Sequence, residues 1–322
     1  MAKNDNKLDQ FYTKPEEAQR LYDLIFKHYK ENDFDMFIEP SCGKNSFGCL
    51  FPKRKELLLD IDPPEDMFKH KDKKYKQKFI KIDFLSFGAV LDILSLSSDR
   101  KVISIGNPPF GKSCSLAIKF FNICAKFSDV ICFIIPRTFK RISVQNQLNM
   151  NFHLIHSEDL PYSNNECIFE PVMNAKCCFQ IWEKRDEQRQ KIILPKQHTD
   201  WEFLGLGDPG EYPFPSNKDT SLEEWKSFDK KRLLKGQPTV PKQASFAMKA
   251  YGSNCGEIVT KDLHELRPKS WHWIKCDDPE WLIGRFGELD YSISDDTVRQ
   301  NSIGRAELVK LYTDHFNNME EE

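Results

Sequence analysis

One apolar run that stops at two consecutive prolines constrains the fold of this chain more than any other feature. Val102–Gly106 is apolar or small throughout, which is typical of a strand buried on both faces of a sheet. Pro108 and Pro109 follow almost at once, and sheet pairing must end there because neither proline has an N–H to donate. Asn107 is pushed toward an extended conformation by the proline after it. The sequence therefore predicts a central strand that ends in a stiff lip carrying an amide side chain, free carbonyls and the ring of Phe110.

Further short apolar runs accompany this strand along the first part of the chain. Helical spacing of apolar residues predicts helices over Pro15–Lys30 and Ser115–Phe127. Short continuous apolar strands that alternate with helices or long connections indicate a mostly parallel sheet covered on both faces, so the expected fold class is α/β. The additional strands are expected at Met36–Ile38, Leu57–Leu59, Phe79–Ile82, Val130–Ile135 and Cys177–Trp182.

The composition changes after Trp182, and this change predicts a second domain. A dense charge run over residues 183–191 is followed by a stretch rich in Pro, Gly and Trp, with weak alternating patterns near residues 245–248 and 271–274. We therefore expect a first domain over residues 1–190 and a smaller region of strands and loops over residues 191–310. A short amphipathic helix is expected over Arg305–Phe316, running into an acidic end that we assign to a disordered tail over residues 311–322.

The bulk composition limits which classes of protein this chain can belong to and which kinds of partner are expected. The formal net charge is −2 for 322 residues, so any contact with nucleic acid must be made by a local surface. The ten cysteines include no C-x-x-C pair and no histidines at zinc spacing, which predicts reduced thiols, an intracellular protein and no metal site. The N-terminus is polar, and the longest apolar run, Val130–Ile135, is far too short to span a bilayer. Membrane association is not expected, and the sequence does not distinguish cytoplasm from nucleus.

The candidate site lies where the expected strands end, because ligands of parallel α/β sheets bind at the carboxyl ends of the strands. The first strand runs into a small-residue turn that begins at Glu39, and Asp60 follows the second, where it can accept from both hydroxyls of a ribose. Asp83 follows the third, beside the ring of Phe84, and Asn107 follows the fourth. A single acid at a strand end is more often a turn former or a helix cap. Four such ends in chain order are much harder to explain in that way.

The chemistry of residues 107–110 points to an amine on a nucleobase. An amide oxygen and a backbone carbonyl can accept both hydrogens of an exocyclic amino group. An aromatic ring can stack on the base that carries the group. These are the parts needed to methylate such an amine.

A competing interpretation comes from the same segment. Gly106–Ser113 fits the phosphate-binding pattern G-x-x-x-x-G-K-[ST] between a strand and a helix. A phosphate cradle is built from successive loop N–H groups, and Pro108 and Pro109 supply none. We therefore expect Lys112 to face solvent or a backbone phosphate of a substrate instead.

Taken together, these motifs resemble those of S-adenosylmethionine-dependent N6-adenine DNA methyltransferases of the Asn-Pro-Pro-Phe type, with a gamma-like motif order and relatives in phage, bacteria and viruses. The resemblance covers residues 9–185 well and implies a Rossmann-like class I methyltransferase fold with a mostly parallel seven-stranded sheet and a C-terminal recognition region. It implies S-adenosyl-L-methionine as cofactor, held by Phe11, Tyr12, Thr13, Glu39, Pro40, Ser41, Cys42, Gly43, Phe47, Asp60, Ile61, Asp83 and Phe84. The implied catalytic residues are Asn107, Pro108, Pro109 and Phe110, and the implied substrate-binding residues are Lys112 and Phe139.

One departure from the family pattern and several alternatives stay open. Many relatives carry a second glycine where this chain has Asn45, but asparagine tolerates positive φ better than other residues, so the turn is expected to survive. The implied partner is nucleic acid, with DNA favoured and RNA possible. Glutamine and cytosine-N4 methylation, and a decayed enzyme that only binds nucleic acid, are less favoured. The recognition sequence and the oligomeric state are not set by the sequence.

Overall fold

The computed structural model describes residues 11–63, 78–86, 100–162, 166–206 and 240–320. The chain divides into two compact units, Met1–Ile192 and Ile193–Glu322. The division falls just after the charge run and close to residue 190, where the change in composition places the end of the first domain. Each unit is described here by itself.

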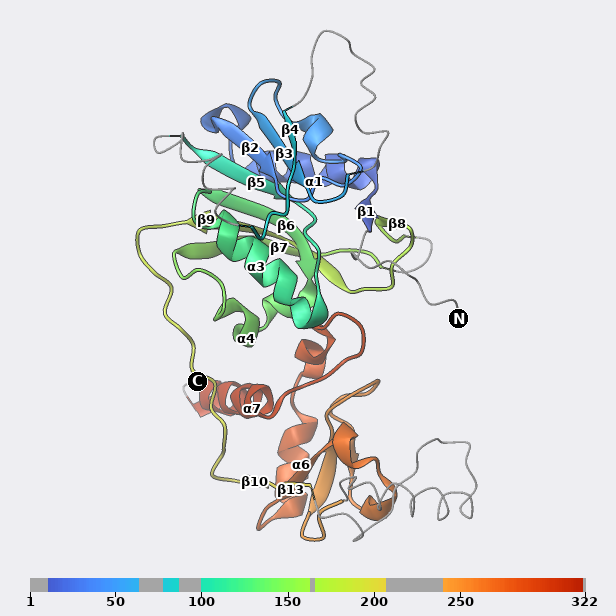
Figure 1. Ribbon diagram of the computed structural model, residues 1–322. Helices are drawn as coiled ribbons and strands as arrows, with labels where there is room; N and C mark the ends of the chain where they lie inside the picture. The colour runs from blue at the N-terminus through green and yellow to red at the C-terminus, as the bar shows by residue number, and fades with distance from the viewer. Residues whose placement is uncertain (1–10, 64–77, 87–99, 163–165, 207–239, 321–322) are drawn as a thin grey trace. The chain divides into compact units, whose positions relative to one another are not determined.

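The first unit is built on a seven-stranded sheet with the order β4-β3-β2-β5-β6-β9-β7 (Figure 1). Neighbouring strands from β4 to β6 pair in parallel, and β9 runs antiparallel between β6 and β7. The expected Rossmann-like α/β fold with a mostly parallel seven-stranded sheet is confirmed by this strand order. The strands are β2 (Met36–Glu39), β3 (Glu56–Asp60), β4 (Phe79–Lys81), β5 (Val102–Gly106), β6 (Val130–Pro136), β7 (Phe152–Asp159) and β9 (Cys177–Lys184).

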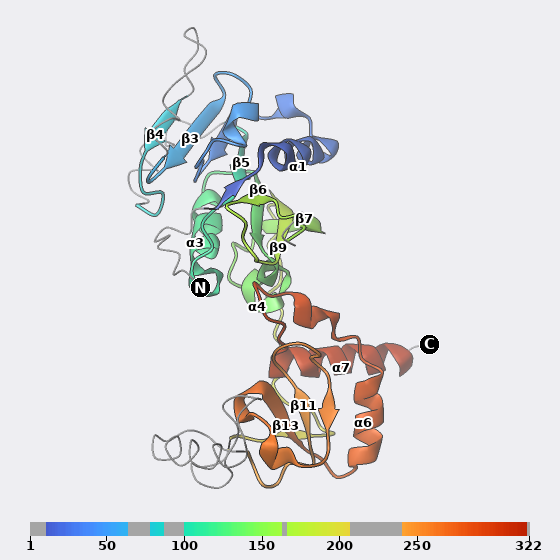
Figure 2. The ribbon, with the colours of Figure 1, turned by 90° about the vertical axis from the view of Figure 1, so that its right-hand side faces the viewer.

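Helices cover both faces of this sheet, as the continuous apolar strands require. The helix α1 (Pro15–His28) and the helix α3 (Ser115–Cys124) lie on opposite sides of the strands (Figure 2). The short helix α4 (Ile142–Gln145) follows β6. All residues of β5 and β6 are buried, so the central strands need apolar side chains on both faces. The buried faces of the two long helices consist of Ala18, Leu21, Tyr22 and Ile25, and of Ala117, Phe120, Phe121 and Cys124.

The strand β7 has no counterpart among the expected strands. It pairs only with β9, and its burial alternates along much of its length, with a bulge between Leu154 and His156. An edge strand is covered on fewer sides than a central one, so it needs no continuous apolar run. This is why the sequence FHLIHSED gave no strand signal by the criterion that identified the central strands.

A two-stranded pairing joins distant parts of the first unit. The strand β1 (Tyr12–Thr13) pairs antiparallel with β8 (Phe169–Glu170). The N–H of Lys14 also donates to the carbonyl of Ile168 at 2.9 Å. The segment before α1 is thereby held against the connection between β7 and β9.

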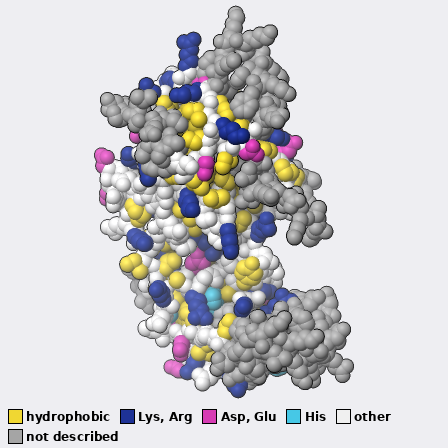
Figure 3. Space-filling model, in the orientation of Figure 1, with side chains coloured by type: hydrophobic (Ala, Val, Ile, Leu, Met, Phe, Trp, Pro, Cys, Tyr) yellow, Lys and Arg dark blue, Asp and Glu magenta, His cyan; other side chains and the backbone are white. Residues whose placement is uncertain are grey.

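Charges of both signs occur on the face of the molecule that Figure 3 shows. Lys and Arg side chains are scattered among Asp and Glu side chains on the described surface shown in Figure 3. This distribution agrees with the net charge of −2.

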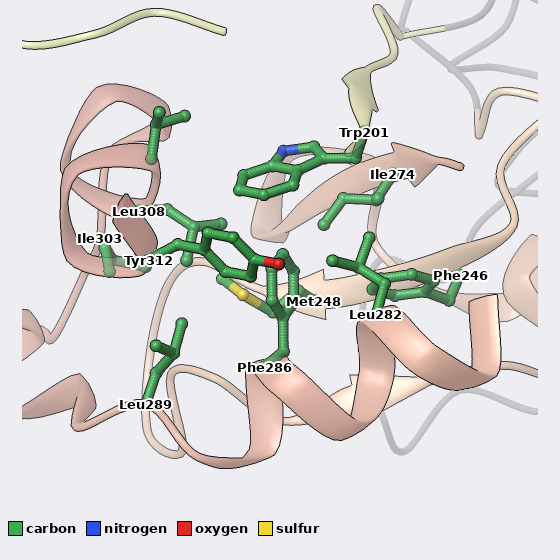
Figure 4. Close-up of a cluster of buried hydrophobic side chains, with 11 residues drawn as sticks. Trp201, Phe246, Met248, Ile274, Leu282, Phe286, Leu289, Ile303, Leu308 and Tyr312 are labelled. Atoms are coloured by element: carbon green, nitrogen blue, oxygen red, sulfur yellow. The ribbon is translucent and has the colours of Figure 1, made fainter. Parts of the chain in front are cut away.

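The second unit contains a four-stranded antiparallel sheet with the order β10-β13-β11-β12. Its strands are β10 (Glu202–Phe203), β11 (Phe246–Lys249), β12 (Ile258–Val259) and β13 (Trp271–Lys275). The alternating patterns of the sequence therefore correspond to β11 and β13. On one face, the main core brings Trp201, Phe246 and Ile274 together with residues of α6 (Pro279–Gly287) and of α7 (Arg305–Glu320) (Figure 4). Trp273 belongs to a smaller cluster with Val240 and Ala247.

The end of the chain corrects one expectation. The helix α7 runs from Arg305 to Glu320, which confirms the helix expected over Arg305–Phe316, whereas the disordered tail assigned from residue 311 is wrong up to residue 320. Tyr312 is 1% exposed in the main core, and its hydroxyl donates to Asp200 Oδ2 at 2.8 Å. Leu308, Val309 and Tyr312 form an apolar stripe that packs the helix down, and this burial outweighs the acidic residues that follow.

Candidate active site

A cavity of about 300 Å³ lies at the carboxyl ends of β2, β3, β4 and β5. A smaller hollow of about 30 Å³ shares part of its lining, including Tyr12, Ser41 and Asn107. The strand ends singled out in the sequence therefore converge, because parallel strands end at the same edge of a sheet. The larger cavity is lined by Phe11, Tyr12, Pro40, Ser41, Gly43, Asp60, Ile61, Asp62, Ile82, Asp83, Phe84, Leu85, Asn107, Pro109, Leu116 and Phe120. The smaller hollow adds Thr13, Glu39, Cys42, Lys44, Ser46 and Phe47.

The turn after β2 needs two residues with positive φ. Gly43 has φ of +46° and Asn45 has φ of +66°, so asparagine does hold the positive-φ conformation that this turn was expected to need. A Cβ at Gly43 would lie 2.8 Å from Cδ1 of Tyr12. The Tyr12 ring can therefore rest on the turn only because residue 43 has no side chain. Lys44 Nζ lies 4.9 Å from the centroid of the same ring.

Asp60 ties this turn to the end of β3. Its Oδ2 accepts from the Gly43 N–H at 2.7 Å, and its Oδ1 accepts from the Asp62 N–H at 2.8 Å. Each carboxylate oxygen has a further lone pair, so Asp60 can still accept from a ligand in the cavity. Next to it, Ile61 is 49% exposed and gives the cavity an apolar wall.

The end of β4 supplies a second acid and a ring. Asp83 is exposed, and its Oδ1 accepts from the Leu85 N–H at 2.9 Å, which fixes the carboxylate at the cavity rim. Phe84 is 2% exposed and packs on Phe120 with ring centroids 4.9 Å apart. Both rings line the cavity, so a flat apolar ligand group would find a firm floor there.

Glu39 is a buried acid in the lining of the smaller hollow. Its side chain accepts from the Gly48 N–H at 2.7 Å, and the residue is only 3% exposed. Burial raises the pKa of Glu39 well above its usual range; the Gly48 hydrogen bond lowers it, and the negative charge of Asp60 raises it further. A cation in the hollow would favour the ionised carboxylate.

Thr13 adds an unused polar atom to the same hollow. Its Oγ1 is buried and has no hydrogen-bond partner among the described residues. Its carbonyl accepts from Ser46 Oγ at 2.6 Å, so the segment is fixed in place. Buried polar atoms are usually paired, and a polar ligand group in the hollow would pair this one.

Asn107 stands at the end of β5 with its amide held in one orientation. Its Nδ2 donates to the carbonyl of Phe11 at 2.9 Å, and its own carbonyl accepts from Ser41 Oγ at 3.2 Å. Because the nitrogen is engaged by a carbonyl, the Oδ1 is the atom left to accept a hydrogen bond in the cavity. The Phe11 anchor joins residues far apart in the chain and has no signal in the local sequence.

The lip after Asn107 turns sharply into α3. The carbonyl of Phe110 accepts from the N–H groups of Leu116 and Ala117 at 3.2 and 3.4 Å. Gly111, Ser113 and Cys114 all have positive φ, at +67°, +52° and +62°. Such a cluster of rare backbone conformations stores strain next to the candidate site.

The two predicted substrate-binding residues and Phe110 do not line the two hollows that the predicted cofactor residues line. Phe139 is fully buried in the turn after β6, so it has no surface to offer a base, and the expectation that it binds substrate is corrected to a packing role. Lys112 is exposed, and Phe110 is half-buried. Neither is among the described residues that line the two hollows, although Pro109 is.

All thirteen residues predicted to hold a cofactor line one hollow or the other. The sequence reasoning missed Leu116 and Phe120, which line the larger cavity from α3. The signal was present, because that helix begins directly after the lip and must pass the strand ends. Within the described parts of the chain, no group of three or more His, Cys, Asp or Glu side chains is arranged to hold a metal ion. No described helix has the length and apolar character needed to cross a membrane.

Comparisons with known proteins give limited similarity. No family model matches the chain. A segment of 135 residues is 28% identical to Protein ENHANCED DOWNY MILDEW 2 of Arabidopsis thaliana and covers 41% of this chain. The match covers 10% of that protein, so the chain spans about a tenth of the length of the curated relative it matches.

Solved structures with similarity to the chain have low TM-scores. A protein of Thermoplasma acidophilum is 16% identical with a TM-score of 0.38, covering 56% of this chain and 94% of its own. A SAM-dependent methyltransferase from Anabaena variabilis is 10% identical with a TM-score of 0.36, covering 56% and 89%. The DrdV–DNA complex gives 12% identity and a TM-score of 0.40, covering 55% of this chain and 27% of that one.

Proposed function

We propose that this protein transfers a methyl group from S-adenosyl-L-methionine to the N6 amino group of adenine in nucleic acid, with DNA as the favoured substrate. The observation that carries the proposal is the Asn107 amide at the end of β5. Its nitrogen is held by the carbonyl of Phe11, and its oxygen is left to accept in a cavity that also contains Asp60 and Asp83.

The described residues fit the cofactor. Asp60 can accept from the hydroxyls of the cofactor's ribose, and Asp83 can accept from the amino group of the cofactor's own adenine. Phe84 and Ile61 offer apolar surface to the adenine ring. In the smaller hollow, Glu39 suits the ammonium group of the methionine end, and the unpaired Thr13 Oγ1 suits its carboxylate. When bound, this cofactor supplies an electrophilic methyl group on a sulfonium.

The catalytic contribution of the chain is positioning together with electrostatic stabilisation. The target adenine is rotated out of its stack, and Phe110 stacks on it. Asn107 Oδ1 and the carbonyl of Pro108 accept the two N6 hydrogens and hold the nitrogen lone pair out of conjugation with the ring. The N6 proton becomes acidic only as the new nitrogen–carbon bond forms, so no strong base is needed.

A methyl-transfer assay tests the proposal directly. The purified chain is incubated with S-adenosylmethionine labelled in the methyl group and with DNA, RNA or protein in separate arms. The modified nucleosides are then identified by mass spectrometry. We expect label in DNA as N6-methyladenine.

Other results of the same assay have distinct meanings. Label in RNA alone would assign the RNA N6-adenosine reaction. Label in glutamine or on cytosine N4 would overturn the assignment to adenine. Cofactor binding without transfer to any arm would indicate a decayed enzyme and overturn the proposed activity.

A further inference from the structure

A group of charged and aromatic side chains lies beside the candidate active site and has no role in the proposed chemistry. Arg137 and Lys140 follow β6, Asp159 ends β7, and Tyr162 comes shortly after it. We call these four residues the Tyr162 shelf. Pairing between strands places Pro136 opposite Cys177 and Asp159 opposite Cys178, so the ends of β6 and β7 lie on either side of the start of β9.

The Tyr162 shelf is adjacent to the lip formed by Asn107–Phe110 at the end of β5. The carboxyl end of β6 is at the same edge of the sheet as that of β5, because Gly106 pairs in parallel with Phe133. Contact is direct at one point, where Cys114 Sγ and Thr138 Oγ1 lie 2.7 Å apart. Thr138 stands between the two shelf cations in the sequence, and Cys114 ends the strained turn that follows Phe110.

Within the shelf, an aromatic ring is held by a cation. The guanidinium carbon of Arg137 lies 5.4 Å from the centroid of the Tyr162 ring, and Tyr162 is 37% exposed. Asp159 Oδ1 lies 3.5 Å from Arg137 Nε and 2.6 Å from Lys140 Nζ. The N–H of Arg137 also donates to the carbonyl of Lys176 at 3.0 Å, so the start of the turn that carries both cations is anchored.

This combination has the chemistry of a nucleic-acid contact. A partly exposed ring held by a guanidinium can stack on a base, and the neighbouring, more exposed lysine can contact the phosphate between two nucleotides. The formal net charge is −2, and on the face shown in Figure 3 Lys and Arg side chains stand among acidic ones, so attraction by a broad basic field is not expected. A local shelf next to the lip can position a strand without such a field.

We infer that Tyr162 stacks on a nucleotide next to the target adenine, with Arg137 supporting the ring from behind, while Lys140 contacts the nucleotide's phosphate. The inference rests on the proposed function and adds a positioning surface to it. It also accounts for how a nearly neutral chain would hold a nucleotide strand while the target base is turned out of its stack.

The test uses the full-length chain and a short oligonucleotide that contains one adenine beside the fluorescent base 2-aminopurine. The oligonucleotide is DNA or RNA, single- or double-stranded, according to which one the methyl-transfer assay shows to be accepted. Binding in the presence of S-adenosylhomocysteine is followed by anisotropy, and stacking by quenching of 2-aminopurine. Tyr162→Ala should remove the quenching and weaken binding about tenfold, the effect of losing one base–aromatic stack.

Matched variants separate stacking from folding. Tyr162→Phe and Tyr162→Trp should keep quenching and affinity within about twofold of the parent, because both rings can stack. Lys140→Met should lower the salt dependence of binding by about one counterion. Arg185→Met removes a cation just beyond the last residue of β9, at the opposite edge of the sheet, and should change neither quantity.

The outcomes distinguish this inference from the proposed function. In the methylation reaction, Tyr162→Ala should raise KM for the oligonucleotide with kcat and cofactor affinity nearly unchanged. If the parent chain methylates adenine and Tyr162→Ala leaves quenching, affinity and KM at parental values, the inference is wrong and the proposed function stands. If the parent chain methylates no nucleic acid, the proposed function fails, and quenching is then measured with all four kinds of oligonucleotide. Quenching that depends on Tyr162 with any of them would still support the contact, and its absence with all four would overturn it as well.

Discussion

At the scale of single residues, the site depends on how one amide is held. Asn107 donates from Nδ2 to the Phe11 carbonyl, and this bond decides which of its atoms is offered to the cavity. The backbone of the lip needs no help from this side chain, since Pro108 and Pro109 already restrict it. The hydrogen-bond acceptor and the backbone conformation of the lip are therefore supplied by different residues, and the two can be tested separately.

The first prediction concerns Asn107→Ala. Removing the acceptor should lower kcat at least about 100-fold, as for the loss of a hydrogen-bonding group that orients or stabilises a transition state. The affinity for S-adenosylhomocysteine should change by no more than a few-fold, measured by calorimetry. Asp60→Ala is the reverse control, because it removes the acceptor that holds Gly43 and should weaken cofactor binding first. Turnover of Asn107→Ala at the parental rate would disprove the mechanism.

The second prediction concerns Glu39 and pH. Because burial raises the pKa of Glu39 in the folded protein, the folded state binds this proton more tightly than the unfolded chain does. The contribution of Glu39 to stability is therefore complete below its unfolded pKa and is lost as pH rises through its folded pKa. A cationic cofactor favours the ionised form, so cofactor affinity should rise with pH over the same interval.

Glu39→Gln provides the check on that linkage. Denaturant unfolding and calorimetric cofactor titrations are repeated across the acidic to neutral range for both proteins. The variant should lose both pH dependences, because glutamine cannot ionise while its amide oxygen can still accept from the Gly48 N–H. Parallel pH profiles for the parent and the variant would show that another group is responsible.

At the scale of elements, the turn after β2 and the strand β1 must fit each other. Gly43→Ala would place a Cβ against the Tyr12 ring at a residue with φ of +46°. We expect a loss of about 1–2 kcal/mol in the unfolding free energy of the first unit and weaker cofactor binding. Denaturant unfolding with and without cofactor would measure the loss of stability of the first unit. A calorimetric titration with the cofactor would measure the loss of affinity.

Gly284→Ala is the control for that substitution. Gly284 lies inside α6, and a Cβ there would meet nothing within 4 Å. Alanine is a better helix former than glycine, so this change should stabilise the second unit by up to about 1 kcal/mol. Equal effects of the two substitutions would contradict the structural account of the turn.

At the scale of the whole molecule, the chain has two units with separate cores. Phe286 is fully buried in the main core of the second unit. Phe286→Ala should therefore destabilise that unit by about 3–5 kcal/mol. Cofactor affinity, which we assign to the first unit, should be unchanged at temperatures where the second unit is still folded.

Tryptophan fluorescence suits the measurement because five of the six tryptophans belong to the second unit: Trp201, Trp225, Trp271, Trp273 and Trp281. The fluorescence transition should move to lower denaturant while the cofactor titration stays the same. A matching loss of cofactor affinity would show that the units are energetically coupled.

The sequence by itself determined the central strands, the helices beside them and the order of the strand ends. Continuous apolar runs have few alternatives to burial in a covered parallel sheet, and two prolines stop a strand wherever it pairs. The family resemblance of the motifs at those strand ends supplied the thirteen predicted cofactor residues, and the parallel strands bring the ends together at one edge of the sheet. The same local reasoning failed for β7, an edge strand without an apolar run, and for the end of the last helix, which was expected to stop at Phe316 but continues to Glu320.

Only the tertiary structure decided which surfaces those residues expose. It placed Phe139 in the interior, set the Phe11 carbonyl against Asn107, and brought Tyr162 beside Arg137. The two contacts join segments that are distant in the chain, and the burial of Phe139 depends on which side of a turn faces solvent. Periodicity and composition carry information about neighbours along the chain. Contacts between distant segments are fixed by the packing of the whole unit, so they could be known only from the tertiary structure.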